Sequence, residues 1–157
     1  MLLLLLLSAC HPDDSVQAES GWYSVDAGET SWSCNAQGPA NGVRADGLVW
    51  VELGESGRWA DDTDALPCVF DGLSFSCEVF DTSVAYAGSG NTDAAVAWSA
   101  RIDAAWVDDE TIEGNVSASY SCRGTECEQV APDYGDGFSF PCDAVTAWVA
   151  PFAGEEG

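Results

Sequence analysis

Two neighbouring stretches of the chain alternate between apolar and polar residues, and this alternation limits the fold more than any other feature. In 93–107 one face would carry Trp98, Ala100, Ile102, Ala104 and Trp106. In 111–122 one face would carry Ile112, Gly114, Val116, Ala118, Tyr120 and Cys122. A period of two is typical of a half-buried strand, whereas a helix needs a period near 3.6. With the polar turn Asp108-Asp109-Glu110 between them, the stretches predict a β-hairpin; a helix over the Ala-rich 94–105 is the alternative.

The rest of the chain from Gly21 onwards also favours β-structure. Short segments rich in Val, Trp, Tyr, Phe and Ser are separated by glycines and Asp-Gly pairs. The expected strands cover 21–26, 29–34, 45–53, 58–60, 66–70, 73–80 and 137–142, the last with a continuation over 144–149. The first two would form a hairpin around Ala27-Gly28, and 48–51 would be covered on both faces. No helix is expected, so the sequence predicts an all-β fold. The first choice is an antiparallel meander barrel of about eight strands, and a two-sheet β-sandwich is the alternative.

Seven cysteines are present. Cys10 follows an N-terminal leucine run that resembles an export signal, described below, so it is counted apart from the other six. An even number in an exported chain indicates three disulfides. The pairs we expect are Cys122 with Cys127 at a hairpin tip, Cys68 with Cys77, and Cys34 with Cys142 as the remaining pair. A turn centred on Gly72-Leu73 sets Cys68 directly opposite Cys77, whereas a turn centred on Asp71-Gly72 makes them diagonal neighbours. A metal site is the weaker alternative, because the chain has no Cys-x2-Cys pair and its single histidine, His11, follows Cys10.

The N-terminus begins with Met1 and six leucines and continues as Ser8-Ala9-Cys10. An apolar run that ends at small residues is typical of a signal peptide and is too short to span a bilayer. Leu7-Ser8-Ala9-Cys10 resembles the lipobox of bacterial lipoproteins, although no Lys or Arg precedes the leucines. Two alternatives remain for this leucine run. The true start codon lies further upstream, or the run is a buried apolar strand and not a signal peptide.

The lipobox resemblance implies cleavage before Cys10 and acylation of that cysteine, so the bilayer would be a partner. His11 stands where an Asp would favour retention in the inner membrane, so the same resemblance favours the outer membrane. The expected organisation is a signal peptide over 1–9, a lipidated cysteine with a flexible tether over 10–20, one β domain over 21–150 and an acidic tail over 151–157.

The charge of the chain is strongly negative. It has 27 Asp and Glu against four Arg and no Lys, which gives a formal net charge of −23. Such a chain has no electrostatic basis for binding nucleic acid or anionic headgroups. A cationic partner or divalent cations would suit it, as would a purely solubilising surface.

Candidate chemistry is sparse. Without a His or Lys in the domain, the usual base for an activated nucleophile is missing, so no catalytic residue or cofactor is predicted. A carboxylate pair of the glycosidase type is a distant alternative. Two acidic clusters, 61–64 and 133–137, could bind calcium, but neither has EF-hand spacing, so solvated turns are the simpler interpretation.

Seven tryptophans would mainly pack in the core, and Trp59, beside an acidic cluster, is the best exposed candidate for a ligand contact. The strand order, and the stretch Ile112-Glu-Gly-Asn-Val-Ser-Ala-Ser-Tyr-Ser-Cys122 that ends at the expected disulfide, resemble the small meander barrels of lipocalin-like and avidin-like exported bacterial proteins. We therefore expect a non-enzymatic structural or interaction domain, with a barrel that binds a small apolar or sugar-like ligand as the alternative.

Overall fold

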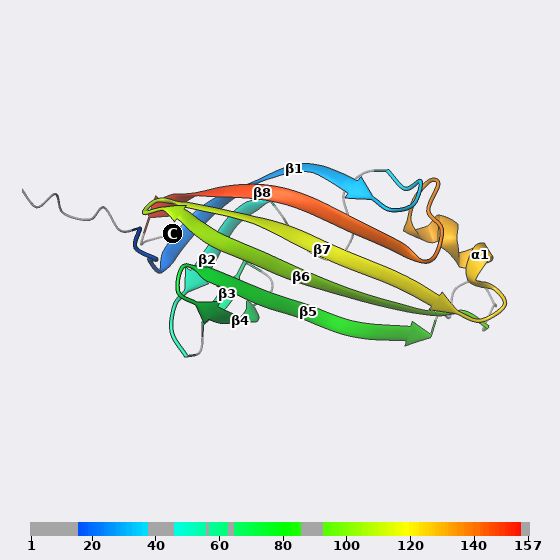
Figure 1. Ribbon diagram of the computed structural model, residues 1–157. Helices are drawn as coiled ribbons and strands as arrows, with labels where there is room; N and C mark the ends of the chain where they lie inside the picture. The colour runs from blue at the N-terminus through cyan, green and yellow to red at the C-terminus, as the bar shows by residue number, and fades with distance from the viewer. Residues whose placement is uncertain (1–15, 38–45, 56, 63–64, 86–92, 155–157) are drawn as a thin grey trace, which may run out of the picture.

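The eight strands of the domain follow one another around a closed antiparallel barrel (Figure 1). This computed structural model describes residues 16–37, 46–55, 57–62, 65–85 and 93–154, and the side chains of 79–85 lie outside the description. The strands are β1 (Gly21–Trp32), β2 (Gly47–Glu52), β3 (Arg58–Ala60), β4 (Ala65–Asp71), β5 (Ser74–Ala85), β6 (Ala95–Asp108), β7 (Thr111–Arg123) and β8 (Cys142–Gly154). The meander barrel is confirmed, and the two-sheet sandwich is wrong because β8 pairs with β1 and closes the sheet.

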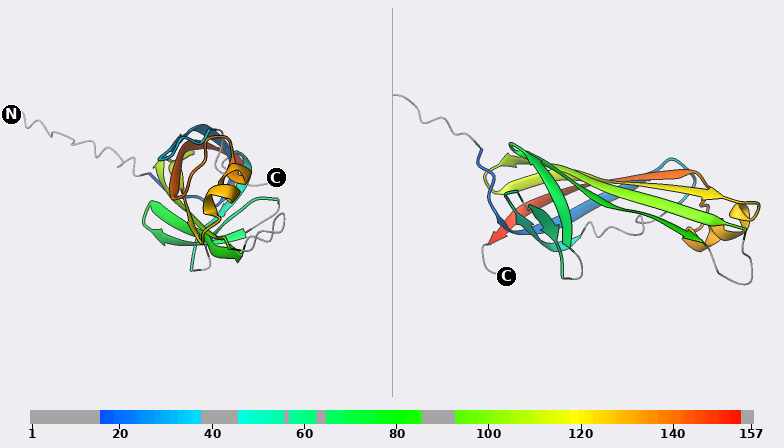
Figure 2. Two further views of the ribbon diagram at one scale, coloured as in Figure 1. Left: turned by 90° about the vertical axis from the view of Figure 1, so that its right-hand side faces the viewer. Right: turned by 90° about the horizontal axis from the view of Figure 1, so that it is seen from below.

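Short strands close the barrel near one end only. β2 pairs with Gly21–Val25 of β1, and β4 pairs with Ser74–Cys77 of β5. Beyond these residues β1 and β5 have one described neighbour each, β8 and β6, and the long strands continue as a curved sheet. We call the end with the β6–β7 turn, Asp108–Glu110, the turn end. The opposite end, with the helices α1 (Cys127–Val130) and η1 (Ala131–Tyr134), is the cap end (Figures 1 and 2).

The alternating pattern of β6 and β7 produces the predicted hairpin. Ile102 lies opposite Val116, and Trp98 lies opposite Tyr120, so the apolar faces of both strands point into the barrel. β8 repeats the pattern, with alternate residues from Cys142 to Ala150 buried. A helix over 94–105 is wrong, because the period-two pattern lets two strands bury one common face.

Three disulfides fix the strands, and they join the pairs expected from the sequence. Cys34 and Cys142 link the end of β1 to the start of β8 across 108 residues of chain. Cys68 lies directly opposite Cys77, the first of the two registers considered, because Gly72 takes a φ of +61° in the tight turn. Cys122 and Cys127 close the loop at the cap end.

Four expectations about strand limits and burial are wrong. Residues 21–32 form one strand instead of a hairpin, with a register shift against β8 between Ala27 and Thr30. The last strand starts at Cys142 and not at 137, and it runs to Gly154, into the expected tail. Cys127 begins a short helix, so the Cys122–Cys127 loop is not a hairpin tip. In β2 only alternate residues are buried, and Leu48 is 55% exposed.

The segment Val16–Ser20 lies against the turn end of the barrel. Val16 and Ala18 pack on the core, and the Ser20 hydroxyl accepts a hydrogen bond from the Leu53 amide at 3.0 Å. These five residues belong to the predicted tether, and in the structure two of their apolar side chains cover part of the barrel surface.

Candidate functional site

The barrel interior at the turn end is filled with aromatic side chains. Tyr23, Trp59, Phe75, Trp106 and Trp148 are all buried. Their ring centroids lie 5.1 Å apart for Trp59–Trp148 and 5.3 Å apart for Phe75–Trp106, within the range of direct aromatic contact. The prediction that Trp59 is exposed is wrong: it is 4% exposed, because β3 pairs on both sides and points this ring inward.

A hydrogen-bonded chain crosses this interior. The Trp106 indole N–H donates to the Tyr23 hydroxyl at 2.9 Å, and that hydroxyl donates to the Glu19 carbonyl at 2.9 Å. Burial raises the pKa of Tyr23, and the Glu19 carboxylate raises it further, against the opposing effect of the Trp106 hydrogen bond. Tyr23 therefore remains a neutral donor that links a core strand to the N-terminal segment.

The interior at the cap end is also occupied. Tyr120 and Phe138 are buried there, and their rings meet at 5.4 Å. Half-buried aromatic side chains pack around them: Trp32, Trp98, Tyr134 and Phe140. Of the polar residues described, only Thr146 is buried, and its hydroxyl bonds that of Thr30 at 2.8 Å. Among the described residues, the buried side-chain polar atom without a hydrogen-bond partner is the indole nitrogen of Trp148, and aromatic rings fill the interior around it.

Trp22 and Trp50 face outward, in contrast to the buried tryptophans. They lie opposite each other on β1 and β2, with ring centroids 5.6 Å apart and both rings half-buried. Sequence reasoning did not single out this pair, since its position on the outer face follows from which residues of β1 point inward.

The described residues form two shallow grooves on the outer face of the barrel. The first, of about 700 Å³, has the backbone of Ala100, Ala118 and Ala144 as its floor. Its rims carry Ser99, Arg101, Ser117, Ser119, Asp143 and Val145. The second, of about 770 Å³, lies nearer the turn end over β6, β7, β8 and β1. Small side chains on these strands leave shallow depressions in the outer surface between the larger side chains. Both are open grooves and not enclosed sites.

The second groove contains carboxylates that bear on the hydrolase alternative, among them Glu113 and Asp26. Glu113 and Asp26 both pair with Val149, one from β7 and one from β1. Two strand spacings separate their backbones by roughly 10 Å. Both side chains are exposed, whereas the general acid of such a pair needs burial to hold its proton at neutral pH. The groove therefore lacks the environment that this chemistry requires.

The two acidic clusters do not form a metal site in the part of the chain that the structure describes. No group of three His, Cys, Asp or Glu side chains is placed to hold an ion among those residues. Residues 63–64 of the first cluster lie outside the description. In the second, Asp133 belongs to η1, and Asp136 is an exposed residue of the following turn.

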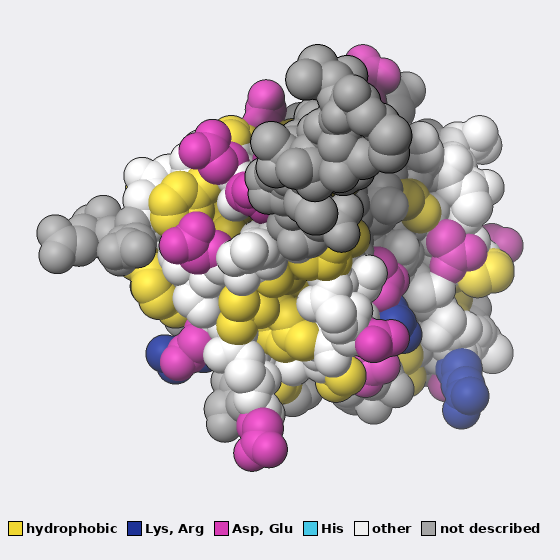
Figure 3. Space-filling model, turned by 60° about the vertical axis from the view of Figure 1, so that its left-hand side comes forward, with side chains coloured by type: hydrophobic (Ala, Val, Ile, Leu, Met, Phe, Trp, Pro, Cys, Tyr) yellow, Lys and Arg dark blue, Asp and Glu magenta, His cyan; other side chains and the backbone are white. Residues whose placement is uncertain are grey.

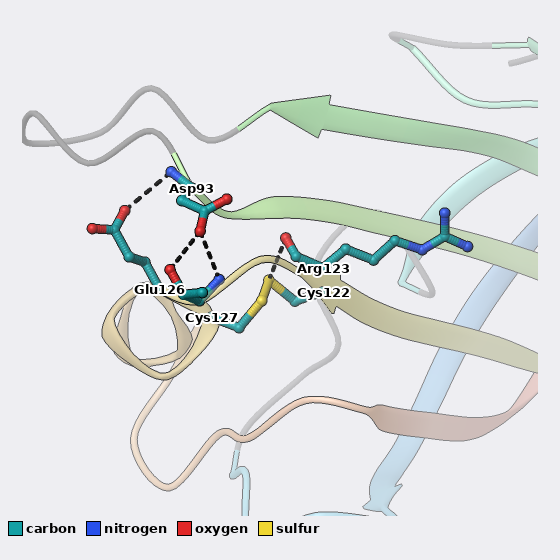
Figure 4. The surroundings of a disulfide bond; sticks show 6 residues. Asp93, Cys122, Arg123, Glu126 and Cys127 are labelled. Atoms are coloured by element: carbon teal, nitrogen blue, oxygen red, sulfur yellow. Dashed lines mark hydrogen bonds between the residues drawn. A yellow bond between two sulfur atoms is a disulfide. The ribbon is translucent and has the colours of Figure 1, made fainter.

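The cap end is held by a reciprocal set of hydrogen bonds beside the Cys122–Cys127 disulfide (Figure 4). The Asp93 carboxylate accepts hydrogen bonds from the amide, at 3.1 Å, and from the hydroxyl of Thr125. The Asp93 amide in turn donates to the Glu126 carboxylate at 3.1 Å. The Thr125 hydroxyl and then its amide lower the pKa of Asp93. This set connects the start of β6 to the loop that follows β7.

The predicted lipid-attachment residue, Cys10, lies outside the described residues. The described part of the chain contains no helix with the length and apolar character needed to span a membrane. Comparison with protein-family models, with curated proteins and with solved structures finds no match. The resemblance to lipocalin-like and avidin-like proteins therefore rests on strand order and pattern alone.

Proposed function

We propose that this chain is a lipid-anchored protein of the bacterial envelope, most consistent with the outer membrane, whose β domain is a non-catalytic interaction module. The proposal that the β domain is a non-catalytic interaction module rests on one observation, which is that side chains occupy the barrel interior. Aromatic side chains fill both ends of the barrel among the described residues, so recognition would use the outer surface. A structural or interaction role is favoured over the alternative of a barrel that binds a small apolar or sugar-like ligand.

The cysteines support the proposal that the chain is a lipid-anchored protein of the bacterial envelope. Six of the seven form three disulfides, which is typical of an oxidising compartment outside the cytoplasm. Cys10 is left over by this pairing, and it stands at the lipobox-like position behind the leucine run. Two or three acyl chains would anchor the domain stably, since each buried methylene contributes about 0.8 kcal/mol.

The test of the anchor is expression of the full chain in bacteria with metabolic labelling by an alkyne fatty acid. The parent should carry the label and sediment with outer membranes, and Cys10→Ala should lose both properties. Pro12→Ala is the matched control, because it lies two residues away and leaves Leu7-Ser8-Ala9-Cys10 intact. Membrane sedimentation of Cys10→Ala equal to that of the parent would contradict the proposal.

The test of the interaction module is native mass spectrometry of the purified parent. We expect the mass of the chain and its acyl groups alone. A stoichiometric small molecule released on unfolding would instead favour the ligand-binding barrel.

A further inference from the structure

The segment Val16–Ser20 is a built contact and not a free end. The Gln17 amide donates to an Asp109 carboxylate oxygen at 2.8 Å, and the Tyr23 hydroxyl donates to the Glu19 carbonyl at 2.9 Å. Val16 and Ala18 alternate with exposed Gln17 and pack against the turn-end core. Three hydrogen bonds, counting that of Ser20, and two apolar contacts hold the segment against the turn end of the barrel.

This contact sets how far the barrel can lie from Cys10. Six residue steps separate Cys10 from Val16, so the reach is at most about 20 Å. Eleven steps separate Cys10 from Gly21, which would give about 37 Å if the segment were free. The contact therefore nearly halves the length of any tether.

We infer that Val16–Ser20 is a clamp that orients the barrel, with its turn end facing the membrane and its disulfide-fixed cap end pointing away. The inference rests on the proposed lipid anchor at Cys10. β7 alone has 13 residues, which extend about 40 Å, so the cap end would be displayed well beyond the reach of the tether. Figures 1 and 2 show the N-terminal segment and α1 at opposite ends of the molecule.

The charge of the turn end sets a limit on how closely it approaches the bilayer. Asp108, Asp109 and Glu110 are exposed there, and acidic side chains surround apolar ones on this side of the surface (Figure 3). Anionic headgroups repel such a surface within a Debye length of about 8 Å at physiological salt. A tether with a reach of about 20 Å is long enough for the domain to stand off by that distance.

The experiment uses the absence of Lys from the chain, because one introduced Lys provides a single side-chain amine for a dye. Ser74→Lys places the dye near the turn end and Ser121→Lys places it near the cap end, both at exposed strand positions. The full lipidated chain is reconstituted in phosphatidylcholine vesicles that carry an acceptor on their headgroups. Energy transfer should be several-fold more efficient from position 74 than from position 121.

The clamp is then released by the double substitution Val16→Asp and Ala18→Asp, which should remove most of that difference. Gln17→Ser is the matched control, since the Gln17 side chain is exposed and only its backbone amide is bonded. Hydrogen exchange at the Gln17 amide should accelerate in the double variant and not in the control.

Three results would overturn the inference. Vesicle-bound parent with equal transfer from both positions would refute the orientation and leave the anchor intact. A difference that survives the double substitution would show that the segment does not set it. Failure of the parent to bind vesicles at all would refute the anchor and the orientation together.

Discussion

Gly114 is the position where a single added methyl group tests the packing of the barrel most directly. It lies on the inward face of β7, opposite Ala104 of β6 and Trp148 of β8. A Cβ at this position would lie 2.7 Å from the Asp103 carbonyl oxygen and 2.8 Å from the Ala104 Cβ, and it would overlap the Trp148 ring. The Asp103 carbonyl and the Ala104 Cβ, which is attached directly to the backbone, cannot move without distorting the β6–β7 ladder.

We expect Gly114→Ala to lower the free energy of unfolding by about 2–3 kcal/mol, the upper part of the range for overpacked cores. For a chain of this length, 1 kcal/mol corresponds to about 2–4 °C, so the melting temperature should fall by about 4–12 °C. Ser117→Ala is the control, because it lies on the outer face of the same strand. Urea unfolding and thermal melts of the oxidised protein, followed by circular dichroism, provide the measurement.

A double-mutant cycle identifies the cause. Trp148→Phe removes the ring edge that the new methyl group would meet, and it also removes an indole N–H that has no hydrogen-bond partner among the described residues. The two substitutions together should be about 1 kcal/mol less destabilising than their sum. Strict additivity, or a Gly114→Ala variant within about 0.5 kcal/mol of the parent, would refute this account of the packing.

Two further predictions concern the covalent and electrostatic links between strands. Replacing Cys34 and Cys142 by Ser should cost about 5 kcal/mol in urea unfolding, because their loop is long, whereas the same change at Cys122 and Cys127 should cost about 2 kcal/mol. A larger loss of unfolding free energy at Cys122 and Cys127 than at Cys34 and Cys142 would contradict the loop-entropy argument. Hydrogen bonds lower the pKa of Asp93, so its stabilising effect is present above the unfolded value of 3.8 and is lost as pH falls through the lower folded value. Asp93→Asn should therefore lose less stability than the parent as pH falls below 3.8. A titration midpoint of Asp93 at or above pH 3.8 by NMR would contradict the lowered pKa.

The sequence predicted those parts of the fold in which neighbouring residues alone decide the structure. The alternation in 95–108 and 111–123 is local, and each strand finds its partner across a two-residue turn, Asp109-Glu110. The Cys68–Cys77 register was likewise limited to two choices by a two-residue turn. In these places period-two patterning and turn chemistry agree, which makes the local pattern sufficient.

Features that depend on distant partners were missed. Trp59 lies beside acidic and glycine residues, but its orientation is set by β2 on one side and β4 on the other. The helix of four residues at Cys127–Val130 is too short to show a period of 3.6, so pattern alone could not reveal it. Val16 and Ala18 did give a signal, a short alternation with Gln17 and Glu19, which the polar composition of the segment concealed.

The distribution of charge narrows what the outer surface can recognise. Among the described residues only Thr146 is a buried polar residue, so the carboxylates described in the structure all reach the surface to some degree. Of the few arginines, Arg58 is paired with Glu52 at 2.6 Å and Arg101 with Asp103 at 2.8 Å. These pairs neutralise the cations locally and leave most of the net charge of −23 without a counter-charge on the chain. Since like charge suppresses association and opposite charge accelerates it, this surface opposes the approach of anionic macromolecules.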